Sequence, residues 1–269
     1  MTLQDLNQEE DSNDLVTELD ISHLVLEDDT PVDNFQSEEQ QRLLVEPLYS
    51  SRAINPPFLA AANIGLFYQL YGDPIVPDVM LSLGVQRRDD FSQRQHRSYF
   101  IWEFGKPPEV CIEIVSNQEG DELTLSAKSR QKNRTLSKKE LYAQIGVRYY
   151  VVFDPLEQIQ GPNEMNGALL RVWAIAPDGY IELTDAEGIR QVGQFVWLNA
   201  VGLGLTLWEG IFEDEVTRLW LRWCDRQGHV IPTGAERAEA ERQRAEAERQ
   251  RAERLAERLR ALGEDPNNI

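Results

Sequence analysis

Apolar residues recur at helical spacing in one early segment of the chain and form short continuous runs after it. Residues 37–50 carry the helical pattern, which predicts an amphipathic helix with Ser37 as its N-cap and Pro47 near its end. Two apolar runs follow at 57–70 and 76–82. Turn-forming residues separate these runs, so they predict two adjacent strands.

The following apolar segments alternate with polar connections. Residues 99–103 predict an edge strand, and the β-branched run at 109–115 predicts a third core strand. A helix is expected over 137–145, ended by Gly146, and a strand over 148–153. A strand, a helix and a strand in this order predict a right-handed parallel crossover.

The second half of the chain predicts further extended segments and two helices. Residues 168–175 and 179–184 suit a hairpin, and 195–208 suits another extended stretch. Residues 210–223 place valine, leucine and tryptophan at helical spacing, which predicts a helix with one buried face. Residues 234–262 repeat a charged heptad, which is typical either of a homodimeric coiled coil or of a single solvated helix.

Charge is unevenly distributed along the 269 residues, whose net charge is -19. Residues 1–40 hold 13 acidic and no basic residues, which leaves 33 acidic against 27 basic residues in the remainder, a net of -6. We therefore expect a disordered acidic segment at 1–35, one catalytic-sized domain at 36–225, and the charged helix at 234–262. The overall charge is unfavourable for binding DNA.

The positions of the cysteines and histidines, and the hydropathy of the chain, argue against several classes of protein. Cys111 and Cys224 lie far apart in apolar contexts, which favours small core residues over a disulfide or a metal site. His23, His96 and His229 occupy dissimilar contexts, so a zinc site or a serine triad has little support. The chain shows no signal peptide and no apolar run long enough for a bilayer, so we expect a cytoplasmic protein without a membrane partner.

Two acids and one lysine form the candidate chemistry. Asp78 opens one predicted strand, Glu113 lies within the next, and Lys138 begins the following helix. Such a set could hold a divalent metal and an attacking water. The other positions on the helical face of Lys138 are Leu141, Tyr142 and Ile145. This face is expected to pack on the sheet, where a lysine is costly unless it meets carboxylates. The alternative is that Lys138 extends past this face to solvent.

Four sequence blocks carry a family resemblance. They are 76–81 (VPDVML), 108–117 (PEVCIEIVSN), 138–147 (K-x-x-x-Y-x-x-x-G-V) and 149–155 (YYVVFDP). With these blocks, residues 36–225 resemble the Uma-type putative restriction endonucleases, a branch of the PD-(D/E)xK nuclease superfamily. The resemblance implies an α/β fold with a restriction-endonuclease-like core: a mixed sheet in the order helix-strand-strand-strand-helix-strand, here followed by an extra hairpin.

The resemblance also implies an activity. The chain would be a Mg2+-dependent DNA endonuclease, with Mn2+ as a substitute metal. Asp78 and Glu113 would bind the metal and Lys138 would be the catalytic lysine. Val115 occupies the strand position where the superfamily usually places that lysine, so the helix would supply it instead. DNA is the expected partner, together with a second copy of the chain in a homodimer.

One departure from the family pattern leaves a second function open. Residues 124–137 look like an insertion before the helix, which could displace the helix or disable the site. The basic residues of this insertion are Lys128, Arg130, Lys132 and Arg134. They suit either a phosphate contact or a solvated loop. The alternative function is a catalytically inactive nuclease fold that binds DNA or proteins and assembles through 234–262.

Overall fold

The computed structural model of the protein describes residues 34–126, 130–131, 134–213 and 215–262. Its largest sheet has six strands in the order β1-β3-β5-β6-β7-β8. These strands are β1 (Phe58–Ala62), β3 (Val79–Leu83), β5 (Val110–Ile114), β6 (Tyr149–Phe153), β7 (Leu170–Ala176) and β8 (Gly179–Glu182). Strands β5 and β6 run parallel, and the other neighbours in this sheet are antiparallel. The expected mixed α/β architecture is confirmed.

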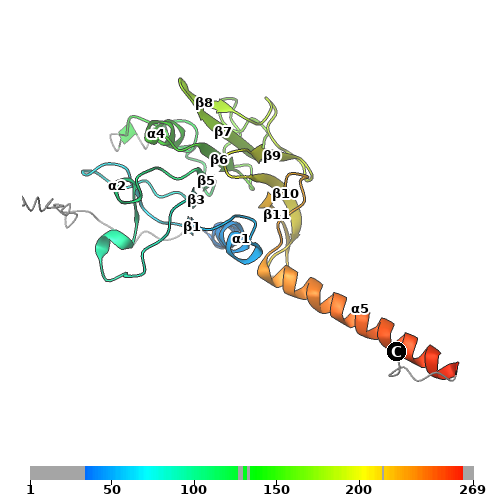
Figure 1. The fold of residues 1–269 in the computed structure, drawn as a ribbon. Coiled ribbons are helices and arrows are strands. Elements are labelled where there is room, and N and C mark those ends of the chain that lie inside the picture. Colours follow the sequence, from blue (N-terminus) through cyan, green and yellow to red (C-terminus); the bar gives the residue numbers. More distant parts are fainter. Residues whose placement is uncertain (1–33, 127–129, 132–133, 214, 263–269) are drawn as a thin grey trace, which may run out of the picture.

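The two faces of this sheet are covered differently. Helix α1 (Phe35–Ser51) lies on one side of the central strands, and α4 (Lys138–Ile145) lies on the other (Figure 1). The α1 side also receives a three-stranded sheet, and the apolar residues of all these elements form one core cluster. A second cluster lies under α4, where Tyr142 packs with Met80 and Cys111. The free thiols Cys111 and Cys224 are both buried, as expected.

Helix α1 begins two residues before the predicted N-cap. The side chain of Asn34 accepts a hydrogen bond from the backbone N–H of Ser37 at 2.9 Å, so Asn34 is the N-cap and Ser37 lies in the first turn. Pro47 lies inside the helix. Leu44 and Leu48 are fully buried against the sheet, so the predicted amphipathic pattern holds.

The predicted strand over 57–70 is two strands. Asn63 has a φ of 51°, a left-handed conformation that ends β1, and the short strand β2 (Leu66–Phe67) follows. Strand β2 pairs in parallel with β4 (Tyr99–Phe100). The helical turns η1 (Arg94–His96) and α2 (Ile101–Phe104) flank β4, so the edge strand expected over 99–103 is only partly present. The strands β2 and β4 and these two helical turns are additional to the simple order predicted from the sequence.

The helix predicted over 210–223 is wrong. This segment comprises the end of β10 (Leu203–Ile211) and most of β11 (Thr217–Cys224). Strand β10 is the central strand of the three-stranded sheet and pairs in antiparallel with β11 on one side and with β9 (Phe195–Leu198) on the other. Leu219, Leu221 and Trp223 pack on one core while Trp220 and Arg222 are buried on the opposite face. Because both faces are buried, the alternation that marks a strand is hidden in the sequence.

Helix α5 (Gly234–Ala261) extends away from the domain (Figure 1). Its first turn is fixed by a capping box between Thr233 and Glu236. Glu236 also binds the buried guanidinium of Arg222 at 2.7 Å, which ties the base of the helix to β11. No residue of α5 is buried. The predicted disorder of 1–35 falls almost entirely outside the described residues.

Candidate active site

Glu113 is the most deeply buried acid of the candidate site. It lies on β5, two residues from Cys111, so both side chains point to the sheet face that α4 covers. Only 1% of Glu113 is exposed. Its Oε2 accepts a hydrogen bond from Lys138 Nζ at 2.7 Å, and its Oε1 accepts one from the hydroxyl of Tyr142 at 2.7 Å. A buried carboxyl group that accepts two hydrogen bonds is held in one orientation.

Lys138 reaches Glu113 because capping interactions determine where α4 begins and ends. Ser137 and Glu140 form a capping box at the start of the helix, and Gly146, with a φ of 88°, ends it. Lys138 and Tyr142 are four residues apart, so they share the face that contacts β5. The Lys138 side chain is 27% exposed and its ammonium contacts carboxylates. This agrees with the inward orientation expected from the helical phase.

The pKa of Lys138 reflects opposing effects of its surroundings. Burial alone would lower the pKa of this ammonium, but the charges of Glu113, Glu122 and Asp78 outweigh burial, and the pKa is raised above its ordinary value. Lys138 is therefore a cation at neutral pH. It can stabilise negative charge, and it is a poor proton acceptor.

Asp78 lies at the start of β3, opposite Glu113. Val79 pairs with Ile112, so continuing the antiparallel register places Asp78 across from Glu113. The Oδ2 atom of Asp78 accepts a hydrogen bond from the backbone N–H of Ile114 at 2.6 Å. Its Oδ1 accepts one from Gln41 Nε2 of α1 at 3.2 Å. The two acids named from the sequence and Lys138 therefore converge at one end of β3 and β5.

Glu122 is a third acid that the sequence reasoning missed. Its Oε1 lies 3.5 Å from Lys138 Nζ, and its side chain is 8% exposed. Its Oε2 is buried and has no hydrogen-bond partner among the described residues. Burial raises the pKa of Glu122, and the nearby charge of Lys138 partly offsets this. Glu122 lies in a polar connection without periodicity, so no sequence pattern indicated that it returns to the site.

Tyr142 was read from the sequence as a core residue and also positions Glu113. Burial and the nearby charge of Glu113 raise the pKa of Tyr142 well above its ordinary value. Its hydroxyl is therefore protonated and donates to Glu113. Gln41 has a similar role on the other side of the sheet, since it binds Asp78 and accepts a hydrogen bond from Asn63 at 2.8 Å. Helical spacing predicted the burial of Tyr142 without its hydrogen bond.

The donor set suits a metal bound by few protein ligands. The described residues contain no group of three or more histidine, cysteine or acidic side chains compact enough to hold a metal. Asp78 and Glu113 nevertheless offer paired carboxylates on adjacent strands. Mg2+ commonly binds one or two carboxylates and completes its shell with water and substrate phosphates. The pair fits this mode of binding.

The expected insertion is only partly described. Lys128 and Lys132 fall outside the described residues, whereas Arg130 and Arg134 are exposed. The backbone N–H groups of Lys138 and Lys139 donate to the carbonyls of Asp121 and Glu122, at 2.8 and 3.1 Å. These bonds fix the approach to α4, so the long connection leaves Lys138 beside Glu113.

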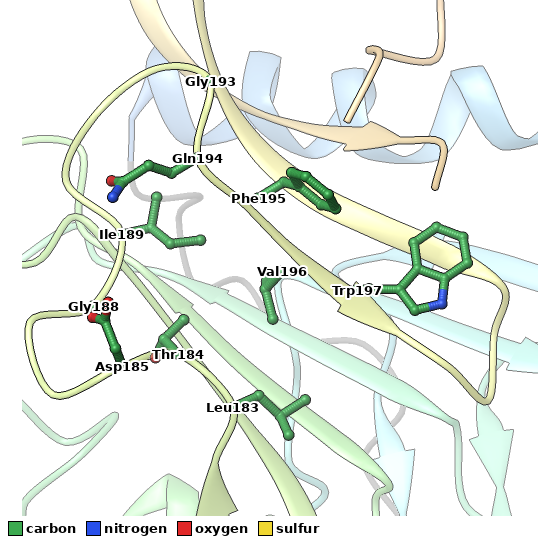
Figure 2. Close-up of a pocket in the computed structure, with 10 residues that line it drawn as sticks. All are labelled: Leu183, Thr184, Asp185, Gly188, Ile189, Gly193, Gln194, Phe195, Val196 and Trp197. Carbon is green, nitrogen blue, oxygen red and sulfur yellow. The ribbon is translucent and has the colours of Figure 1, made fainter. Parts of the chain in front are cut away.

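A pocket lies elsewhere in the molecule. It has a volume of about 530 Å³ and is lined by residues of the β8–β9 connection and β9, including Asp185, Gln194 and Trp197 (Figure 2). None of its lining residues belongs to the site around Glu113. The candidate site is a cluster of charged groups at one end of the interior strands β3 and β5, and its chemistry must come from those groups.

A mixed sheet with acids on adjacent strands and a helical lysine beside them is consistent with a nuclease-like α/β protein. A model of the family Uma2, described as putative restriction endonuclease, matches residues 13–160, a span that includes Asp78, Glu113 and Lys138. The chain belongs to this family. A search of curated proteins found no match. Among the described residues, no helix combines the length and apolar character that a membrane span requires.

Proposed function

We propose that this chain is a Mg2+-dependent DNA endonuclease that hydrolyses phosphodiester bonds. The observation that carries the proposal is the ion pair of Lys138 with the buried Glu113, with Asp78 next to them at the start of the adjacent strand. Ion pairs buried only for stability are often replaceable by apolar residues, so a cation held among several buried acids favours a functional role. Membership of the Uma2 family supports a nuclease.

In this proposal Asp78 and Glu113 hold the metal, which can also be Mn2+. Each carboxylate oxygen has two lone pairs, so the hydrogen bonds to Glu113 leave acceptor capacity. When bound, Mg2+ supplies positive charge beside the scissile phosphate and makes a water more acidic. The Ile114 N–H and Gln41 orient Asp78, and Tyr142 orients Glu113.

Lys138 stabilises the charge that develops on the phosphate oxygens during hydrolysis. Its raised pKa keeps the ammonium charged. A fixed cation in a site with little water stabilises developing negative charge more strongly than the same cation in solvent. Glu122 and Glu113 hold the ammonium in place, so little reorganisation is needed when the phosphate arrives.

A cleavage assay on supercoiled plasmid DNA tests this function. Wild-type protein should nick or linearise the plasmid with Mg2+ or Mn2+ at low salt, and Asp78→Asn and Lys138→Met should abolish cleavage. Lys106→Met is the matched control, because Lys106 forms an ion pair with Glu109 next to the opposite end of β5. This control should retain cleavage. Intact plasmid with the wild type across metals and pH would overturn the proposal.

A second candidate is a catalytically inactive nuclease fold that binds DNA or proteins. Both Glu113 oxygens already accept hydrogen bonds from protein groups, and Val115 is buried where the superfamily usually places the lysine. Helix α5, which has no buried residue, would assemble two copies into a homodimer. Tight DNA binding without cleavage under any metal would favour this candidate over the endonuclease.

A further inference from the structure

The connection between β3 and β4 is basic within an acidic protein. Residues 86–97 contain four arginines and two aspartates, a net charge of +2 with His96 neutral. The four arginines are Arg87, Arg88, Arg94 and Arg97, and all are exposed. An exposed local excess of arginine in a chain of net charge -19 requires an explanation other than solubility.

The connection is an ordered loop with its own hydrogen bonds. Asp90 accepts hydrogen bonds from the backbone N–H of Ser92 at 2.9 Å and from Gln93 Nε2 at 3.0 Å. Arg97 Nε donates to the carbonyl of Phe91 at 2.8 Å. One aspartate and one arginine therefore maintain the shape of the loop.

Arg87 and Arg88 are left to face solvent. The guanidinium of Arg87 lies 5.1 Å from the centroid of the Phe91 ring, a contact that orients it without neutralising it. Among the described residues, neither Arg87 nor Arg88 forms an ion pair with a carboxylate. Two adjacent, unneutralised guanidinium groups on an ordered loop suit the phosphate backbone of a nucleic acid.

The loop lies on the sheet face that carries the candidate site. A cavity of about 50 Å³ beneath it is lined by Met80 of β3 and Ala61 of β1, together with Arg87. Met80 and Asp78 are two residues apart and point to the same face, which separates them by roughly 7 Å along the chain. The loop and Asp78 therefore lie on one face of the sheet, the face that a bound duplex would occupy.

We propose that residues 86–97 form a phosphate-backbone contact surface for duplex DNA, with Arg87 and Arg88 as its contact residues. The inference rests on the proposed nuclease function, and it adds the surface that holds the substrate beside the site. Guanidinium groups recognise phosphate oxygens in any sequence, so this surface positions the duplex and does not read bases. It supplies the local attraction that the overall charge of the protein opposes.

Fluorescence anisotropy with a labelled duplex tests the surface apart from cleavage. Binding is measured at several salt concentrations in EDTA and again with Ca2+, with the full chain carrying Arg87→Ala and Arg88→Ala together. Each lost phosphate contact should lower the slope of log affinity against log salt by about 1, so the double variant should lose about 2. Its affinity at low salt should fall by about tenfold or more.

Two further variants separate local from global charge. Arg244→Ala with Arg251→Ala on α5 removes the same charge at a distance from the loop, and its affinity and salt slope should match the wild type. Arg87→Lys with Arg88→Lys keeps the charge and should retain most of the binding. Circular dichroism and unfolding in urea establish that the alanine variant is folded.

The outcomes distinguish the two proposals. If the wild type binds duplex and the alanine variant binds equally with the same salt slope, the loop surface is wrong while the nuclease proposal stands. If binding depends on the loop but no metal supports cleavage, the loop surface stands and the nuclease proposal fails. A wild type that binds no duplex at low salt overturns both.

Discussion

Lys138 Nζ lies 2.7 Å from Oε2 of Glu113 and 3.5 Å from Oε1 of Glu122, so one ammonium forms ion pairs with two buried carboxylates. The three groups come from a strand, a loop and a helix. Because the cation lies between acids that would otherwise repel each other, it stabilises this end of the sheet, and in the proposed nuclease it would also attract an anionic substrate.

Lys138→Met should destabilise the protein strongly. The substitution leaves two buried carboxylates without their cation, and breaking a buried pair in this way costs about 3–5 kcal/mol of unfolding free energy. Unfolding in urea measures the loss. Lys106→Met breaks a more exposed pair and should cost about 1 kcal/mol or less. Adding Glu113→Gln to Lys138→Met should recover part of the loss, and an undiminished loss in the double variant would contradict the coupling.

The contribution of Lys138 should disappear in alkali. Its pKa is raised in the folded protein, so the stabilisation is fully present below its ordinary pKa of 10.5 and is lost as the pH rises through the higher folded value. The difference in unfolding free energy between wild type and Lys138→Met should therefore be constant from neutral pH to about pH 10 and shrink above it. A difference that stays constant at higher pH would show that Lys138 does not act through its charge.

Glu122→Gln should stabilise the protein at neutral pH. The pKa of Glu122 is raised, so its ionisation costs stability above the ordinary value of 4.5 as the pH rises through the folded value. An amide removes this cost, with an expected gain of about 1 kcal/mol, the lower end of the cost of an unpaired buried polar group. The gain should vanish in acid. Glu241→Gln on exposed α5 controls for the change in net charge and should have no comparable effect in urea unfolding.

Tyr142→Phe should weaken the site without changing its shape. The variant removes the donor to Glu113 Oε1, and a hydrogen bond to a charged group contributes about 1.5–3 kcal/mol. Tyr180→Phe is the matched control, because the hydroxyl of Tyr180 donates to the neutral carbonyl of Val147 at 2.7 Å and should cost about 1 kcal/mol. Thermal unfolding of both variants compares them. Equal losses would show that the charge of Glu113 adds nothing to this bond.

The sequence predicted those parts of the site that local periodicity determines. Alternation on β5 placed Glu113, helical phase placed Lys138, and both lie where these patterns indicate. Glu122 was missed because its position depends on a loop whose path is fixed by backbone hydrogen bonds to α4. Such tertiary contacts leave no pattern in a single sequence.

The wrong helix at 210–223 has a related physical cause. Val216, Leu219, Trp220 and Trp223 fit a helical face, but Leu219, Leu221 and Trp223 also fit one face of a strand. The strand interpretation requires Arg222 to be buried, and Arg222 is 1% exposed. The guanidinium is accommodated by Glu236 of α5 and by the ring of Trp208, 4.8 Å away. A charged residue in a buried strand is not expected until its distant partner is known.

The length of α5 should matter for assembly but little for stability. A chain ending after residue 240 keeps Glu236, which binds Arg222, and should unfold within about 1 kcal/mol of the full chain because no residue of α5 is buried. A chain ending after residue 232 loses that partner and should be less stable by about 2 kcal/mol, since Glu236 is 40% exposed and the pair only partly buried.

Light scattering reports assembly on the same samples. If α5 joins two copies, the full chain is a dimer and the chain ending after residue 240 is a monomer. Equal oligomeric states in both would remove α5 as a dimerisation element.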